Sequence, residues 1–211
     1  MNINNDKLKE GDKMIRTIMF DYGGVLTTKR RSQLFAESLQ AQYGVKPEEV
    51  IGITDGAQKT WSKGEMSTEE VLSKIQALGV TEDIESLEEK LASFNTIDDN
   101  MMALLTELKQ NYDICLVTDG LPPFTKAIKR DYAHLFRMAV FSDDEGCLKG
   151  EADHRLFDIA FARIGTPPDQ CVYVDDREKF LAYPKSVGTT CILFAGEKEL
   201  RQSLRELDVI C

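Results

Sequence analysis

The sequence predicts an α/β fold, a doubly wound, Rossmann-like parallel sheet with helices on both faces, to which a small all-helical cap domain is added. Short apolar runs, typical of buried strands, alternate with helical patterns through the second half of the chain. A long block with helical periodicity alone stands between the first strand and the rest. The length of 211 residues suits one domain that carries a sizeable insertion. We therefore expect a core domain over residues 14–28 and 96–211 and a cap domain over residues 29–95.

The first strand is predicted over Arg16–Phe20, a run rich in β-branched and apolar residues. Asp21 follows this strand directly, and after Tyr22 come two glycines, Gly23 and Gly24. A buried strand that ends on a carboxylate, before a backbone able to turn sharply, is typical of a ligand site at the carboxyl edge of a parallel sheet. Residues 1–13 are polar and lack a hydrophobic period, so they are predicted to be a disordered leader or an upstream start.

The block from residue 29 to about residue 95 is predicted to be entirely helical. No strand pattern interrupts it, and its length is too great for a simple crossover between two strands. Apolar residues recur at every fourth position from Phe35 to Tyr43, and Pro47 is expected to begin a short helix. A capping box at Ser67–Glu70 and an apolar face from Ile84 to Phe94 indicate two further helices.

Strands and helices alternate from there to the end of the chain, and the strands are continuously apolar, as expected for a parallel sheet covered on both faces. The predicted elements are helix Asp98–Gln110, strand Ile114–Val117, a helix from Pro122 to Tyr132, strand Met138–Phe141, helix Asp153–Ile164, strand Cys171–Val174, a helix ending at Gly188, strand Cys191–Phe194 and a helix that carries Leu200, Leu204 and Leu207.

Composition narrows the possible partners. A net charge of −10 and a pI near 4.8 argue against nucleic acid or an anionic membrane as the main partner. No apolar run approaches the ~18 residues of a spanning helix, and no signal peptide is visible. The five cysteines are odd in number and include no CxxC pair: Cys115, Cys147, Cys171, Cys191 and Cys211. Cys115, Cys171 and Cys191 each lie in an apolar, strand-like run, which indicates free buried thiols in a reducing cytosol. We therefore predict a cytoplasmic protein, and its oligomeric state stays open.

Three of the predicted strands end on polar residues, and a lysine lies in the loop that follows another strand, Met138–Phe141. These residues are Asp21, Thr118 with Asp119, Asp175 with Asp176, and Lys149 in the loop Ser142–Gly150. Carboxylates, a hydroxyl and an ammonium in one crevice suit phosphoryl transfer through a covalent intermediate. Asp21 and Asp176 would repel each other if bare, so a divalent cation between them is expected.

Four stretches carry a resemblance to a known family. FDYGGVL, LVTDG, the Lys149 loop and VYVDDRE resemble, in order and spacing, the motifs of the haloacid dehalogenase superfamily of hydrolases, in members with a cap inserted after the first strand. The resemblance runs from about Met14 to Phe194. It implies a Mg²⁺-dependent hydrolase of a small phosphomonoester, such as a sugar phosphate, with a helical cap that selects the substrate.

The resemblance also implies roles for individual residues. Asp21 would be the nucleophile that forms an aspartyl-phosphate intermediate. Thr118 would hydrogen-bond the phosphoryl oxygens, with Asp119 beside it, and Lys149 would hold the nucleophile and the phosphate in place.

The implied Mg²⁺ ligands are Asp21, Asp176 as a direct ligand, and Asp175 as a ligand or a neighbour of one. The main-chain carbonyl of Gly23 would be a further ligand, because in the family the metal contact from this position is made by the backbone.

The sequence departs from the family pattern at four places. Gly23 replaces the second Asp that serves most phosphatases of the family as general acid and base, and Asp119 stands where Asn is more usual. Gly-Glu-Ala follows Lys149 in place of Pro-Asp-Pro, and Phe180 stands where Asn is frequent. A missing general acid typically costs ~10²–10⁴-fold in rate. The loss is smallest for a good leaving group, as in a sugar 1-phosphate or an acyl phosphate.

Two other functions stay open. Gly23 raises the alternative of a catalytically weak or silent member that binds a phosphorylated ligand or a protein partner. A 2-haloacid dehalogenase also uses an Asp nucleophile and lacks the second Asp. The dehalogenase function is disfavoured because Asp175 and Asp176 indicate a metal site, which dehalogenation does not use, and because Asp119 replaces an Asn.

Overall fold

A five-stranded parallel sheet forms the centre of the protein. The structure, a computed structural model, describes residues 14–28 and 30–210, so the predicted leader and Cys211 lie outside the described residues. The strand order is β3-β2-β1-β4-β5, and every neighbouring pair is parallel, which confirms the predicted α/β class. The strands are β1 (Thr17–Phe20), β2 (Asp113–Thr118), β3 (Met138–Phe141), β4 (Cys171–Asp175) and β5 (Thr190–Leu193).

The register of β1 aligns the ends of three strands. Phe20, the last residue of β1, lies opposite Leu116 on β2 and Val174 on β4. Because the strands are parallel, their carboxyl ends leave the sheet at the same edge. Asp21, Thr118 and Asp175 therefore stand side by side at that edge.

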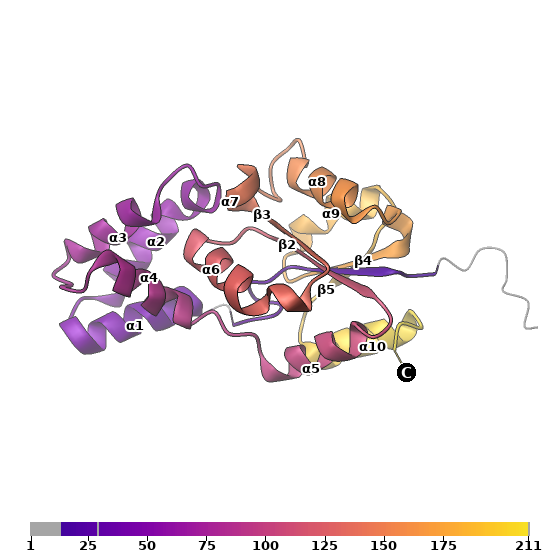
Figure 1. Ribbon diagram of the computed structural model, residues 1–211, viewed down its shortest axis with the longest axis horizontal. Helices are drawn as coiled ribbons and strands as arrows, with labels where there is room; N and C mark the ends of the chain where they lie inside the picture. The colour runs from indigo at the N-terminus through magenta and orange to yellow at the C-terminus, as the bar shows by residue number, and fades with distance from the viewer. Residues whose placement is uncertain (1–13, 29, 211) are drawn as a thin grey trace, which may run out of the picture.

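One face of the sheet packs on the helices α5 (Asp99–Leu108) and α10 (Glu197–Glu206), which lie below the sheet in Figure 1. Ile18 and Phe20 point to this face and belong to the same apolar cluster as residues of both helices. Alternate residues of a strand point to opposite faces, so the residue between them must pack on the other side.

That residue, Met19, joins the cluster on the second face. There the helix α8 (Arg155–Ile164) covers the sheet, and α9 (Ala182–Ser186) lies beside it in Figure 1. Both faces are thus buried under helices, which explains why the strands read as continuously apolar runs.

Shorter elements complete this part of the chain. They are α6 (Pro122–Ala127), a π-helix (Ile128–Tyr132) that continues it, α7 (Ser142–Glu145), and single 3₁₀ turns at Ala133–Leu135, Pro168–Gln170 and Glu178–Phe180. The expectation of a loop over Ser142–Gly150 was wrong in its first half, because α7 forms one helical turn there and ends at Gly146, whose φ of 65° is left-handed.

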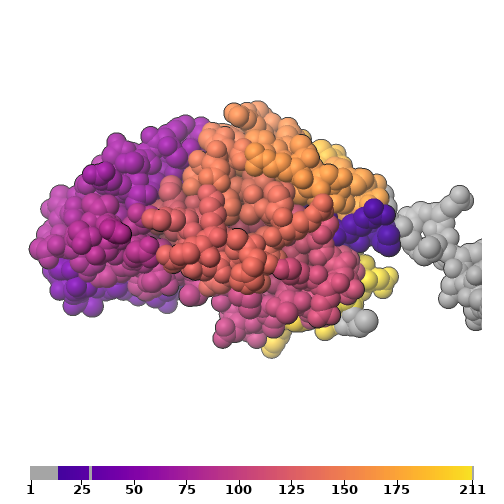
Figure 2. Space-filling view, in the orientation of Figure 1, coloured from indigo at the N-terminus to yellow at the C-terminus, as the bar shows by residue number. Residues whose placement is uncertain are grey.

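Four helices lie between β1 and α5: α1 (Arg31–Tyr43), α2 (Pro47–Ser62), α3 (Thr68–Gln76) and α4 (Ile84–Ser93). We call them the helical unit (residues 31–93). They share their own apolar cluster, to which only Leu121 and Phe124 are added from the rest of the described chain. Figure 2 shows the unit, in indigo and purple, as a lobe at one end of the molecule. That this lobe is a separate cap domain stays a prediction.

The helix that begins at Pro47 was predicted to be short, and this was wrong. It runs for 16 residues, because buried side chains recur at three- and four-residue intervals from Val50 through Thr54 and Ala57 to Trp61. The predicted capping box at the start of α3 is confirmed, since the side chains and main-chain amides of Ser67 and Glu70 bond reciprocally.

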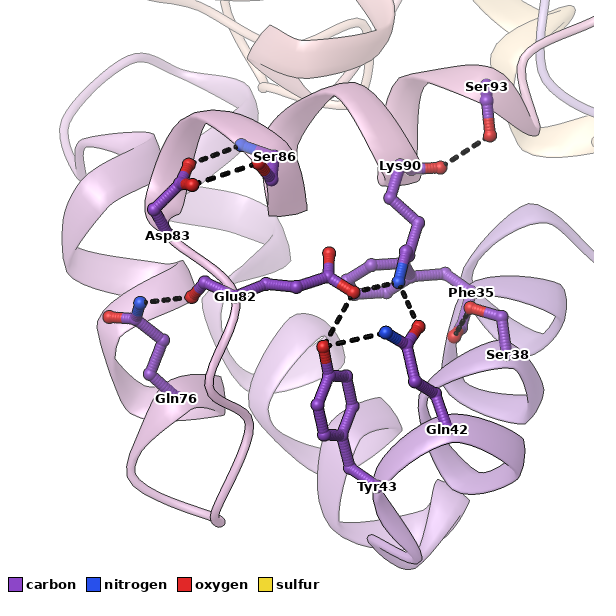
Figure 3. Close-up of polar contacts among 10 residues, drawn as sticks. All are labelled: Phe35, Ser38, Gln42, Tyr43, Gln76, Glu82, Asp83, Ser86, Lys90 and Ser93. Carbon is purple, nitrogen blue, oxygen red and sulfur yellow. Dashed lines mark hydrogen bonds and ion pairs between the residues drawn. The ribbon is translucent and has the colours of Figure 1, made fainter.

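A polar cluster ties the outer ends of the helical unit together (Figure 3). The Glu82 carboxylate pairs with Lys90 and accepts a hydrogen bond from the Tyr43 hydroxyl at 2.8 Å. Lys90 Nζ also donates to Gln42 Oε1 at 2.6 Å, and Gln76 Nε2 donates to the Glu82 carbonyl at 2.6 Å. The cluster thereby links α1 and α4 with the segment that joins α3 to α4.

The described thiols are not paired. Cys115 and Cys171 are buried, as predicted, and so is Cys147, whereas Cys191, which was predicted to be buried, is only partly buried. Burial raises the pKa of Cys115 to about 11 and that of Cys171 to about 12, so both stay protonated at neutral pH. None of the described helices combines the length and the apolar character that crossing a bilayer requires.

Candidate active site

The loop after β1 buries Asp21 at the edge of the sheet. The Asp21 amide donates to the Val174 carbonyl at 2.9 Å, which extends the β1–β4 pairing by one residue. The Tyr22 carbonyl then accepts three main-chain hydrogen bonds from the residues that follow, and Gly24, with a φ of 87°, makes the turn. The chain folds back at once, and Asp21 is left 7% exposed.

The Lys149 ammonium lies between two carboxylates. Its Nζ is 2.9 Å from Asp21 Oδ1 and 2.7 Å from Asp175 Oδ2, and its side chain is 1% exposed. Burial by itself would lower the pKa of Lys149, but Asp21, Asp175 and Asp119 outweigh burial and raise this pKa above its usual value. Lys149 is therefore a fixed positive charge beside Asp21.

Asp175 holds Lys149 in place. Its Oδ2 accepts hydrogen bonds from Lys149 Nζ and from the Tyr173 hydroxyl at 2.5 Å, and its Oδ1 accepts from the Arg177 amide at 2.9 Å. Tyr173 OH also lies 3.2 Å from Lys149 Nζ. Both oxygens of the Asp175 carboxylate are thus engaged by the protein itself.

Three carboxylates gather at the ends of β1 and β4. Asp21, Asp175 and Asp176 each offer one oxygen, and these oxygens all lie within 4.8 Å of one another. Carboxylate oxygens are the ligands that Mg²⁺ prefers in proteins. The donor set therefore fits a hard divalent cation.

Thr118 and Asp119 follow β2 into the same region. Thr118 is buried and lines the cavity above the sheet edge. Asp119 Oδ1 accepts a hydrogen bond from the Lys149 amide at 2.9 Å. Burial raises the pKa of the Asp119 carboxyl, against the opposing effect of Lys149. Asp119 therefore positions the Lys149 loop through its main chain.

The aromatic ring of Phe180, a departure from the family pattern, lies over Lys149. The ammonium is 4.7 Å from the ring centroid, a cation–π distance. The ring thus closes one side of the Lys149 site.

A cavity of about 870 Å³ opens over the sheet edge. Its floor includes Asp21, Thr118 and Lys149, and its opposite wall comes from the helical unit. The residues of that wall are Arg31, Asp55, Gln58, Lys59 and Ser62. A second cavity of about 330 Å³ shares Gly23 and Arg31 with the first and also reaches Asp176.

The seven residues that the sequence singled out come together at this one place. Asp21, Gly23, Thr118, Asp119 and Lys149 line the larger cavity, Asp176 lines the smaller one, and Asp175 lies buried beneath them. His134 and His154 line neither cavity. Trp61 is fully buried in the helical unit.

Sequence reasoning missed two residues of the site. Tyr173 stands two positions before Asp175 on the same strand, so both point to one face, and this period-two signal could have found it. Arg31 carries no local signal, because only the packing of the helical unit brings it beside Gly23.

The comparisons with known proteins agree with this architecture. A family model of haloacid dehalogenase-like hydrolases matches residues 15–179. A haloacid dehalogenase (HAD) family enzyme from Bacteroides thetaiotaomicron superimposes with a TM-score of 0.71 at 19% identity, over 90% of this chain and 99% of that one. Its wild-type complex with magnesium and inorganic phosphate gives 0.66 at 17% identity, over 84% and 93%.

A HAD phosphatase from Thermococcus onnurineus superimposes with a TM-score of 0.61 at 19% identity, over 90% of this chain and 98% of that one. No curated protein matched. At such identities the solved structures show a shared fold, whereas the family model covers most of the chain. The chain therefore belongs to the haloacid dehalogenase-like hydrolases.

Proposed function

We propose that this hydrolase is a Mg²⁺-dependent phosphomonoesterase in which Asp21 is the nucleophile. The observation that carries the proposal is the Lys149 ammonium held between Asp21 and Asp175, beside a cluster of three carboxylates and under a large cavity. The magnesium and phosphate bound by the Bacteroides neighbour, and the phosphatase from Thermococcus, support the same chemistry.

Asp21 and Asp176 would be the direct ligands of the cation, with the Gly23 carbonyl as a further ligand. Asp175 would act beside them, because its two oxygens already accept three hydrogen bonds from Lys149, Tyr173 and the Arg177 amide. When bound, Mg²⁺ supplies positive charge that neutralises the phosphate and orients it for attack.

In the first step the Asp21 carboxylate attacks phosphorus, the bond from phosphorus to the ester oxygen breaks, and an aspartyl phosphate forms while the leaving oxygen takes a proton from solvent and departs as the alcohol. Lys149 holds the carboxylate in place and, with the Thr118 hydroxyl, binds the phosphoryl oxygens. Water then attacks the aspartyl phosphate and releases inorganic phosphate and free Asp21. The lack of a side chain at Gly23 favours substrates with good leaving groups, such as a sugar 1-phosphate.

We also propose that residues 29–95 form a cap over this site. Exposed polar residues of α2, among them Asp55, Gln58 and Lys59, line the cavity opposite the nucleophile. A substrate bound at Asp21 would therefore touch the helical unit, and this unit would choose among phosphomonoesters.

The test is phosphate release from glucose 1-phosphate and 4-nitrophenyl phosphate, with Mg²⁺ and after EDTA. We expect EDTA to abolish turnover and Asp21→Asn to lower kcat by at least 10³-fold, since the nucleophile is lost. Asp99→Asn, at an exposed carboxylate in the first turn of α5, is the matched control and should keep full activity. Unchanged activity in Asp21→Asn would remove Asp21 from the mechanism.

Because Gly23 supplies no general acid, the alternative of a catalytically silent protein that only binds a phosphorylated ligand or a protein partner stays open. Turnover of any phosphomonoester would exclude this alternative. The dehalogenase alternative requires halide release from a 2-haloacid without added metal. The three clustered carboxylates argue against it, because that reaction needs no cation.

A further inference from the structure

The guanidinium of Arg31 occupies the space that a side chain at position 23 would need. A Cβ added to Gly23 would lie 2.5 Å from Arg31 Nη2, far closer than a normal contact. The φ of Gly23 is not in the left-handed region, so its backbone does not call for glycine. Glycine at this position therefore makes room for Arg31 beside the nucleophile.

Arg31 is held in this place by groups from three parts of the chain. Its Nη1 donates to Asn95 Oδ1 at 2.6 Å, and its guanidinium lies 4.2 Å from the centroid of the Phe124 ring. Asn95 is fixed in turn, because its Nδ2 donates to the Phe124 carbonyl and its own carbonyl accepts from the Tyr22 hydroxyl, both at 3.2 Å. The guanidinium is thus oriented before any ligand binds.

The other edge of this guanidinium has no acceptor among the residues that the structure describes. Across residues 14–28 and 30–210, Arg31 makes a single hydrogen bond, through Nη1, and no ion pair, which leaves Nε and Nη2 as donors. Burial lowers the pKa of Arg31 to about 10, so it remains charged at neutral pH. Arg31 is partly buried, and a partly buried cation with unused donors is stabilised when an anion binds it. The Nε–Nη2 edge matches the two oxygens of a carboxylate.

The place of Arg31 determines which part of a substrate it would meet. It lines both cavities together with Gly23, and Asp21 lines the larger one. A phosphate attacked by Asp21 already has Lys149 as its cation. Arg31 comes from the helical unit, and its guanidinium enters the cavity beside Gly23 and apart from the Lys149 bridges, so it would face the organic part of the substrate.

We propose that Arg31 is a specificity-determining residue that binds a carboxylate on the leaving group, so that the site selects phosphomonoesters of hydroxy acids. This inference rests on the proposed function for the position of the phosphate. Lys59, Arg177 and Lys179 also line the larger cavity, but so do Asp55, Glu151 and Asp153, so the preference is assigned to Arg31 alone.

The experiment compares two substrates of equal size, phosphoglycolate and its neutral amide, glycolamide phosphate. Because hydrogen bonds to charged groups contribute more than neutral ones, we expect kcat/KM of the wild type to favour phosphoglycolate by about tenfold or more. Arg31→Gln should bring this ratio close to one, chiefly through a higher KM for phosphoglycolate. Arg30→Gln is the matched control, since Arg30 is exposed and pairs with Glu37 at 3.1 Å, and it should keep the preference.

Gly23→Ala provides a second variant that keeps the Arg31 charge and moves only its guanidinium. We expect it to weaken the preference as well, and it decides the matter if Arg31→Gln does not fold. Calorimetric titration of both compounds into Asp21→Asn measures the same preference without turnover. The inference would be overturned if phosphoglycolate were preferred neither in the wild-type kinetics nor in the Asp21→Asn titration. It would also be overturned if the preference survived in both Arg31→Gln and Gly23→Ala.

Failure of the proposed function looks different. In that case 4-nitrophenyl phosphate, which has no carboxylate, would not be hydrolysed by the wild type. A preference for phosphoglycolate in the titration that depends on Arg31 would then still support this inference, as a binding site.

Discussion

On the sheet side of the cavity the charged groups hold one another, whereas on α2, across the cavity, they face solvent. Asp21, Lys149 and Asp175 are buried and joined by contacts of 2.7–2.9 Å. Asp55 and Lys59 on α2 are exposed and make no ion pair within the described residues. The comparison sets buried, mutually paired charges at the sheet edge against hydrated, unpaired charges on α2.

The difference has an energetic reason. A buried charge is tolerated only with partners, and removing one partner strands the others without water. An exposed charge is hydrated whether or not a partner is present, and its ion pairs contribute little. Changes on the sheet side should therefore cost both stability and activity, whereas changes in the helical unit away from the cavity should cost little of either.

The largest effect is expected for Lys149→Met. The variant leaves Asp21 and Asp175 buried without their counter-ion, so we expect the free energy of unfolding to fall by about 3–5 kcal/mol and phosphatase activity to disappear. Urea denaturation measures the first and phosphate release the second. Lys126→Met, at an exposed lysine that pairs with Glu88 at 3.0 Å, should lose less than about 1 kcal/mol. Equal losses in the two variants would contradict the comparison.

A smaller effect is expected for Tyr173→Phe. It removes one donor from Asp175 and leaves the Lys149 bridges in place. A lost hydrogen bond to a buried charged group costs about 1–3 kcal/mol, so stability should fall by this amount and kcat should fall several-fold while KM changes little. A stability equal to that of the wild type would show that the hydroxyl does not support Asp175.

The stability of the wild type at alkaline pH tests the buried charges around Lys149 without a mutation. Because the pKa of Lys149 is raised in the folded state, its contribution to stability is complete below the unfolded pKa and is lost as pH rises toward the folded one. Between pH 9 and pH 11 we expect the free energy of unfolding to drop by roughly 1 kcal/mol from this lysine. Tyr173, whose pKa burial also raises, acts in the same direction. Urea midpoints that do not fall over this interval would exclude a buried, charged Lys149.

The smallest effect is expected in the polar cluster of Figure 3. Lys90→Met removes the bridge from Glu82 to Gln42, at a site where the lysine side chain is 23% exposed. We expect a loss of at most about 1 kcal/mol in unfolding free energy and unchanged kcat and KM, because the cluster lines neither cavity. A large change in KM would show that the helical unit transmits strain to the site and would break the comparison.

The site could be anticipated because its signals are local. Each of Asp21, Thr118 and Asp175 ends a short apolar strand, and the carboxyl ends of parallel strands always meet at one edge. The length of α2 and the helical turn of α7 were not anticipated, because both depend on which side chains find partners outside their own segment.

Asp119 shows how far a motif can lead. Its place after β2 predicts a contact with phosphate, which stays a prediction, whereas the hydrogen bond that its Oδ1 accepts from the amide of Lys149, 30 residues further along the chain, was not anticipated. Such a contact depends on how two loops meet, and no periodicity within either loop encodes that meeting.

By itself, the sequence determined the fold class, the helical insertion and the residues gathered at the sheet edge, since hydrophobic periods and strand ends are properties of short segments. Only the tertiary structure decided that Asp175 accepts a hydrogen bond from Lys149 and that the Arg31 guanidinium fills the space beside Gly23. Both facts arise from side chains packing across segments far apart in the chain, where distance and desolvation, rather than sequence spacing, set the interaction.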